Sequence, residues 1–187
     1  MSKKKVTRSY RRLSAVKSKT YRRPFDSLKT LAGKRVRIAA DALEQLRLKK
    51  LVSTPGTYFD TSPIVDDEDA DNFVYDYDSI KKILADKNTQ CNVCALGSLF
   101  CGLGSVNGDF RTSSHIQSTL SEYFDYDQMN FIEACYEGTW INGYDCYATE
   151  QNSLYKRWTK KYPDDDKRLA AILQNIVKNR GTFTGKC

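Results

Sequence analysis

The segment CNVCALGSLFCGLG, residues 91 to 104, constrains the fold most strongly because it is apolar on every side. A helix on the surface of a protein exposes a polar stripe, whereas a helix without such a stripe must be surrounded by other elements. Gly97 and Gly102 each lower helix propensity by up to about 1 kcal/mol, which indicates that another backbone packs closely against them. We therefore predict a buried central helix at about residues 92 to 103.

Other segments have apolar side chains three and four residues apart, the spacing typical of amphipathic helices. The clearest is DDDKRLAAILQNIVKNRG, in which acids precede the apolar stripe and Gly181 follows it. Further helices are predicted at about residues 35 to 51, near residues 149 to 161, and in SIKKILA, SSHIQSTLSEYF and DQMNFIEACYE. A chain of 187 residues suffices for one domain with a sizeable core. We expect a mainly α fold, a single compact domain of six or seven helices, with a short strand pair near Tyr58 or Trp140.

The formal net charge of +7 is distributed unevenly along the chain. Residues 1 to 37 contain 14 Lys or Arg and one acid, Asp26, so they carry +13, and the remaining residues carry −6. Residues 1 to 23 contain no acid and few apolar side chains, a composition expected to be disordered unless bound. We predict a basic N-terminal arm at residues 1 to 33 and a helical domain at residues 34 to 187.

An arm with this charge density is expected to bind the phosphates of nucleic acid with little sequence discrimination. Its charge exceeds what solubility requires, which favours a binding role over a solvated surface. Tyr10 and Tyr21 lie among arginines and would add stacking on exposed bases. The predicted nucleic-acid-binding residues are Lys3, Lys4, Lys5, Arg8, Tyr10, Arg11, Arg12, Lys17, Lys19, Tyr21, Arg22 and Arg23.

Cys91 and Cys94 form a C-x-x-C motif, which is compatible with a zinc site, a redox pair or two buried core residues. Zinc requires a second pair of ligands, and the other nitrogen or sulfur donors form no second close pair in the sequence: Cys101, His115, Cys135 and Cys146. The seven-residue spacing of Cys94 and Cys101 places both on one helical face and favours small core residues. A zinc- or thiol-dependent enzyme or regulator using Cys91 and Cys94, with His115 near, is the alternative function.

Residues 60 to 78 contain eight acids and no base. Asp67, Asp69, Asp71 and Asp78 follow part of the spacing of a calcium-binding loop, although the usual glycine and the terminal glutamate are both replaced. A solvated acidic loop is the favoured interpretation, and a calcium site is the alternative. A segment this acidic also allows a third function, in which the protein inhibits a host factor by mimicking nucleic acid.

Five segments occur in a fixed order along the chain: RVRIAADALEQL, GTYF, CNVCALGSLF, YFDYDQMNFIEACYE and RLAAILQNIVKNRGTF. In this order they resemble a group of uncharacterised proteins encoded in bacteriophage and bacterial genomes. The resemblance covers roughly residues 34 to 184, and its most distinctive part is the segment C-x-x-C-A-x-G-(A/S)-L-F. It implies a phage or bacterial origin, and it assigns no activity and no catalytic residue.

These features predict a non-enzymatic phage or bacterial binding protein. The basic arm would anchor it to nucleic acid or to a nucleoprotein or virion assembly, and the helical domain would contact a protein partner. No stretch approaches the roughly 18 to 20 consecutive apolar residues that span a bilayer, so no membrane is expected and the cytoplasm or the virion is the expected location. The phosphate-binding glycine motifs do not occur in the sequence, and no cofactor is predicted beyond the zinc or calcium alternatives.

Overall fold

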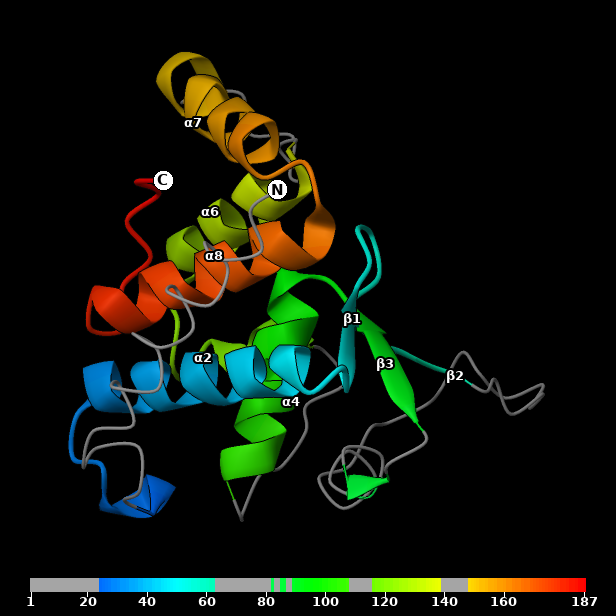
Figure 1. The fold of residues 1–187 in the computed structure, drawn as a ribbon. Helices are drawn as coiled ribbons and strands as arrows, with labels where there is room; N and C mark the ends of the chain where they lie inside the picture. Colours follow the sequence, from blue (N-terminus) through cyan, green and yellow to red (C-terminus); the bar gives the residue numbers. More distant parts are fainter. Residues whose placement is uncertain (1–23, 63–81, 83–84, 87–88, 108–115, 139–147) are drawn as a thin grey trace, which may run out of the picture.

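The computed structural model in Figure 1 describes residues 24–62, 82, 85–86, 89–107, 116–138 and 148–187. The elements within these ranges are η1 (Phe25–Ser27), α2 (Leu31–Arg47), β1 (Leu51–Ser53), β2 (Asp60–Ser62), β3 (Gln90–Val93), α4 (Ala95–Val106), α5 (Ile116–Leu120), α6 (Tyr126–Glu137), α7 (Ala148–Lys161) and α8 (Asp165–Lys178). The described part of the chain thus contains six α-helices, which confirms the prediction of a mainly α domain. None of the described helices is both long and apolar enough to cross a membrane.

Helix α4 is the buried central helix that the sequence predicts. Its residues from Ala95 to Gly104 are all buried, and α2, α5, α6 and β3 pack around it. A Cβ atom on Gly97 would overlap the carbonyl oxygen of Tyr58, and one on Gly102 would lie 2.5 Å from the carbonyl oxygen of Ile38. The expectation that other backbones approach these two glycines is therefore confirmed.

The start of α4 differs from the prediction of a helix from about residue 92. Residues Gln90–Val93 form β3 instead, because their backbone pairs with two other strands. The side chain of Cys94 then accepts the backbone N–H of Gly97 at 3.5 Å and caps the helix. Cys91 consequently lies in a strand, away from the helix N-terminus where the sequence places it.

The three strands form one sheet in the order β1-β3-β2. Strands β1 and β3 are parallel, with Leu51 opposite Cys91, and β2 is antiparallel to β3, with Asp60 opposite Asn92. The predicted strand pair is therefore a three-stranded sheet whose β1 and β2 flank Tyr58. Trp140, the other predicted location, lies outside the described residues. Strands of three or four residues carry too little alternation to be recognised in a sequence.

Helix α2 begins at Leu31, where the side chain of Thr30 accepts the backbone N–H of Gly33 at 3.1 Å, and it ends at Arg47. The helix predicted at about residues 35 to 51 is therefore displaced toward the N-terminus. Lys49 has a φ of 62°, which breaks the helix and lets the chain enter β1. The described fold begins before the predicted boundary at residues 33 and 34, since Phe25 is buried in the core.

Helix α8 confirms the clearest helix prediction in the chain. Asp164 accepts the backbone N–H of Lys167 at 2.9 Å and so caps the N-terminus. Gly181 follows with a φ of +91°, a conformation that glycine adopts without strain. In Figure 1, α8 lies across α2, while α6 and α7 lie on the far side of α8. Val177 of the predicted apolar stripe is partly buried, and the other four residues of the stripe are fully buried: Leu169, Ile172, Leu173 and Ile176.

Gly97→Ala tests the close approach of α4 to Tyr58. The added methyl group has no room against a backbone carbonyl, so we expect the free energy of unfolding to fall by about 3 kcal/mol. Gly33→Ala is the matched control, because its Cβ would lie 3.1 Å from the Thr30 side chain at an open helix start, and its effect should stay within about 1 kcal/mol. Urea unfolding followed by circular dichroism measures both, and equal effects would contradict the packing described.

Candidate functional site

The predicted arm residues lie outside the described residues, but the point where the arm meets the body is described. Phe25 and Leu28 are buried, and the Phe25 ring lies 5.8 Å from that of Tyr123. The Lys34 ammonium lies 5.4 Å from the centre of the Phe25 ring, and Arg35 donates from Nε to the Tyr123 carbonyl oxygen. The base of the arm is therefore fixed to the start of α2 and to the segment between α5 and α6.

The C-x-x-C cysteines are buried core residues in this fold. Cys91 and Cys94 are each only 1% exposed. Burial is the main cause that raises the pKa of Cys91 to about 11 and that of Cys94 to about 12. Cys101 is also buried, as expected from its shared helical face with Cys94, and burial raises its pKa well above the usual value. In the metal-free protein these thiols are protonated at neutral pH, and a protonated thiol is a poor nucleophile.

Among the other candidate metal ligands, Cys101 in α4 lies near enough to Cys91 and Cys94 for their charges to add to burial in raising its pKa. Within the described ranges no group of three or more His, Cys, Asp or Glu side chains is placed to hold a metal ion, and the five cysteines there are free thiols. The following predicted residues lie outside the described residues: Asp67, Asp69, Asp71, Asp78, His115 and Cys146.

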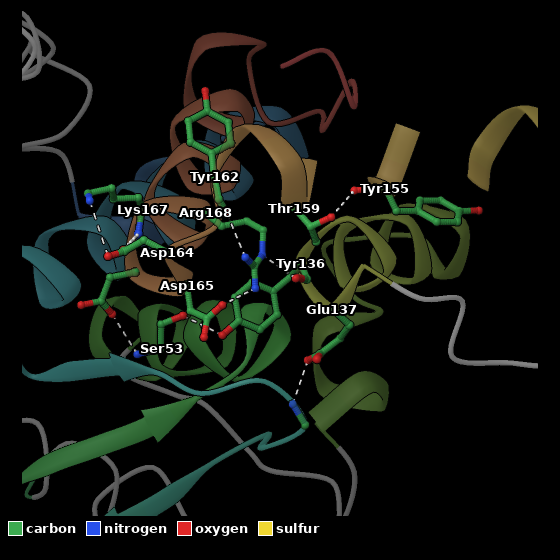
Figure 2. A network of polar contacts seen from close by, with 12 residues as sticks. Ser53, Tyr136, Glu137, Tyr155, Thr159, Tyr162, Asp164, Asp165, Lys167 and Arg168 are labelled. Atoms are coloured by element: carbon green, nitrogen blue, oxygen red, sulfur yellow. Dashed lines mark hydrogen bonds and ion pairs between the residues drawn. The ribbon is translucent and has the colours of Figure 1, made fainter. Parts of the chain in front are cut away.

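A network of polar contacts centred on Arg168 joins three helices (Figure 2). Arg168, only 5% exposed, donates from Nε to the Tyr136 carbonyl oxygen at 2.6 Å and from Nη1 to the Tyr162 carbonyl oxygen at 2.8 Å. Its third contact is an ion pair with Asp165, and its guanidinium lies 5.3 Å from the centre of the Tyr136 ring. All three nitrogens of this cation donate within the fold, which identifies Arg168 as a structural residue.

The chain between β1 and β2 is held to the helices by the same region. Ser53 Oγ and Tyr136 Oη share a hydrogen bond of 2.6 Å, and the Ser53 amide donates to Asp166 at 3.1 Å. The Gly56 amide donates to Glu137 at 2.9 Å (Figure 2). This segment therefore has a defined position over the ends of α6 and α8, and it carries Tyr58 to the side of α4.

Glu133 is the described acid with the most unusual surroundings, because it is only 4% exposed. Tyr58 donates its hydroxyl to Glu133 Oε2 at 3.4 Å, and Gln117 donates to the Tyr58 hydroxyl at 3.2 Å. No Lys or Arg of the described residues forms an ion pair with Glu133. Burial raises the pKa of Glu133, and burial together with the nearby Glu133 charge raises the pKa of Tyr58 to about 12.

The sequence reasoning did not single out Glu133. The signal was present in the spacing, because Glu133 lies four residues after Met129 and next to Ile132 on a helix whose apolar stripe contains both. Chemically, this buried carboxyl group can bind and release a proton, but the cysteine beside it, Cys94, is held in its protonated form. A proton-binding group without an activated nucleophile does not define a reaction.

In comparisons with known proteins, no family model, no curated protein and no solved structure matches this chain. The residues and their geometry are therefore the basis for inferring its function.

Thiol labelling tests the description of the cysteines. At about pH 8 only about one Cys91 in a thousand and one Cys94 in ten thousand is ionised, given their pKa values of about 11 and 12. We expect an aromatic disulfide reagent to modify the exposed Cys187 rapidly and these two cysteines only on unfolding. Peptide mass spectrometry assigns the labelled sites, and Cys187→Ser is the control. Rapid labelling of Cys91 or Cys94 in the folded protein would contradict the description of buried, protonated thiols and would favour the thiol-dependent alternative.

Glu133→Gln tests the buried carboxyl group through pH dependence. Because its pKa is raised in the folded protein, its stabilising contribution is complete below the unfolded-state value of about 4.3 and is lost as pH rises through the folded-state value. The variant does not titrate at this position. The difference in free energy of unfolding, variant minus wild type, should therefore increase as pH rises from about 4.5 to 7. Urea unfolding at several pH values measures the difference.

Asp164→Asn is the control of opposite sign. The Lys167 backbone amide donates to Asp164 and lowers its pKa, so the stabilising contribution of this carboxylate is present above the unfolded-state value and is lost as pH falls. The Asn variant should therefore be less stable than the wild type at neutral pH and approach it in acid. A pH-independent difference for Glu133→Gln would show that Glu133 is not a buried titrating group.

Proposed function

We propose that this chain is a non-enzymatic nucleic-acid-binding protein whose basic arm, which precedes the buried Phe25, anchors it on phosphates. The observation that carries the proposal is the charge density of residues 1 to 37, with 14 Lys or Arg against one acid. Cations at this density displace the counterions condensed on nucleic acid, and this release supplies sequence-independent affinity. The arm is therefore expected to bind many sequences with similar strength.

The way the arm is attached supports an anchoring role. Phe25 is buried two residues after Arg23, the last of the predicted binding residues, so no free linker separates arm and body. The neighbouring Lys34 lies over aromatic rings, and Lys29 is exposed. A body joined so closely must follow wherever the arm binds. The anchored body is then available to a protein partner, and this second contact is part of the proposal.

The resemblance to phage and bacterial proteins supports a place for this binding in a bacterial or infected cytoplasm or in a virion. Its residues lie in the body, so the body is the part expected to recruit the chain to an assembly. The nucleic acid would then be the genome or a transcript held by that assembly. Tyr10 and Tyr21 would favour single-stranded regions, where bases are exposed for stacking.

The two alternative functions have less support. A thiol- or zinc-dependent reaction at Cys91 and Cys94 would have to overcome the burial and raised pKa values of both thiols. Mimicry of nucleic acid or calcium binding by residues 60 to 78 rests on a segment that lies almost entirely outside the described residues. Of the eight acids in this segment, Asp60 in β2 is the one that lies within the described residues.

Neutralising four arginines of the arm tests the proposal in the full chain. We expect R11Q/R12Q/R22Q/R23Q to weaken binding equally across sequences and to reduce the slope of log K against log salt by about 1 for each phosphate that the variant no longer neutralises. Fluorescence anisotropy with mixed-sequence duplex DNA, single-stranded DNA and RNA at about 50 to 300 mM salt measures affinity and slope together.

A control of equal charge separates the arm from net charge. The variant R47Q/K82Q/K178Q/K186Q also removes four exposed cations, but these are dispersed over the body. It should change affinity by less than about threefold, because dispersed charges act only through a screened long-range field. Reduced binding to selected sequences only, or an equal reduction in the control, would overturn the arm as a phosphate anchor.

A further inference from the structure

Helix α7 presents four cations on one exposed face. At 3.6 residues per turn, spacings of one, three and four residues gather side chains within about 140° of the helix circumference. All four are exposed in the structure: Lys156, Arg157, Lys160 and Lys161. Figure 1 shows α7 at the outer edge of the helical body.

The opposite face of α7 fixes the helix in place. Tyr155 and Trp158 are buried, and Trp158 Nε1 donates to the Gly185 carbonyl oxygen at 2.8 Å. The Trp158 ring also lies 5.4 Å from that of Phe183 and 5.5 Å from that of Tyr162. Because the aromatic side chains hold the helix in one orientation, the four cations lie together in the unbound protein.

The three acids that follow α7 in the sequence are occupied elsewhere (Figure 2). Asp164 caps α8 and pairs with Lys167 at 3.5 Å, Asp165 pairs with Arg168, and Asp166 accepts the Ser53 amide and pairs with Lys49 at 3.5 Å. Within the described part of the chain, no ion pair joins a carboxylate to any of the four α7 cations. Their positive charge is therefore not neutralised by the neighbouring acids.

The helix dipole explains only part of this charge. Cations in the last turn of a helix are favoured by the partial negative charge of its C-terminus, and Lys160 and Lys161 occupy that turn. The dipole effect falls off within one turn, whereas Lys156 and Arg157 lie a turn earlier. Four exposed cations on a rigid face match a row of negative charges on a partner.

We propose that this face of α7 is a second nucleic-acid contact, made to backbone phosphates. The inference rests on the proposed function of the arm and extends it to the folded body. Phosphates are the expected target because the aromatic residues of this part of α7, Tyr155 and Trp158, are buried and offer no ring for stacking on bases. The contact therefore adds affinity without sequence preference.

The arm and α7 can act on one nucleic-acid molecule. Residues 1 to 23 span at most about 80 Å when extended, at about 3.3 to 3.6 Å per residue. Once the arm is bound, the α7 contact becomes intramolecular, so even a weak face benefits from the high effective concentration. The two contacts together would orient the body on the nucleic acid, which the arm alone cannot do.

The test compares four variants of the full chain with the wild type by anisotropy, using the same mixed-sequence duplex and single strands. We expect K156Q/R157Q/K160Q/K161Q to weaken affinity about tenfold or more at low salt and to reduce the salt slope by about 2 to 4. The charge-preserving variant K156R/R157K/K160R/K161R should bind like the wild type. R47Q/K82Q/K178Q/K186Q, which removes the same charge elsewhere, should change affinity less than about threefold.

The fourth variant, R11Q/R12Q/R22Q/R23Q, separates this inference from the proposed function. If it fails to bind while the α7 variant matches the dispersed-charge control, the arm is the anchor and the α7 contact is refuted. If the wild type has no salt-dependent binding to any probe, both the arm anchor and the α7 contact are refuted. If the charge-preserving variant binds as weakly as the Gln variant does, the cause is a damaged helix and not charge, and the α7 contact is refuted as well. Circular dichroism and thermal unfolding confirm that each variant is folded.

Discussion

Close packing of backbone against the buried helix α4 is the constraint on which the rest of this structure depends. Gly97 admits the Tyr58 carbonyl and Gly102 admits the Ile38 carbonyl, and no larger residue leaves space for either. Each of the other described α-helices and strands packs against α4 or against an element that does. An element surrounded on all sides has no polar face to solvate, so its position determines where the amphipathic elements can bury their own apolar stripes.

This arrangement places the polar groups in three different settings. Arg168 is buried with its hydrogen bonds made inside the protein, and so it links helices at little net electrostatic cost. Glu133 is buried with the Tyr58 hydroxyl as its partner and without an ion pair to any described cation, so its ionised form is disfavoured. The exposed cations of α7 are the third setting, since they are neither buried nor paired with the neighbouring acids. The first two settings concern stability, and the third is the basis of the proposed phosphate contact.

The base of the arm and α7 lie on well-separated parts of the body. Figure 1 shows η1, where the arm joins, and α7 on opposite sides of the layer formed by α2 and α8. A nucleic acid held at both places would run along the body, and the arm is long enough when extended to follow it. The aromatic pairs Phe25 with Tyr123 and Trp158 with Phe183 hold the base of the arm and α7 on the same core.

The sequence by itself determined the helical class, the buried helix, the outline of α8 and the basic arm, because periodicity, glycine placement and charge are local properties of the chain. Helix α7 was also predictable as an element near residues 149 to 161, and the structure has it at Ala148–Lys161. Only the tertiary structure decided that Gln90–Val93 is a strand, since its hydrogen-bonding partners lie about 30 and 40 residues away. It also decided that Glu133 faces the core and that the α7 cations face solvent without an ion pair to the acids that follow them. Burial and ion pairing depend on which distant residues meet, and no local pattern encodes that.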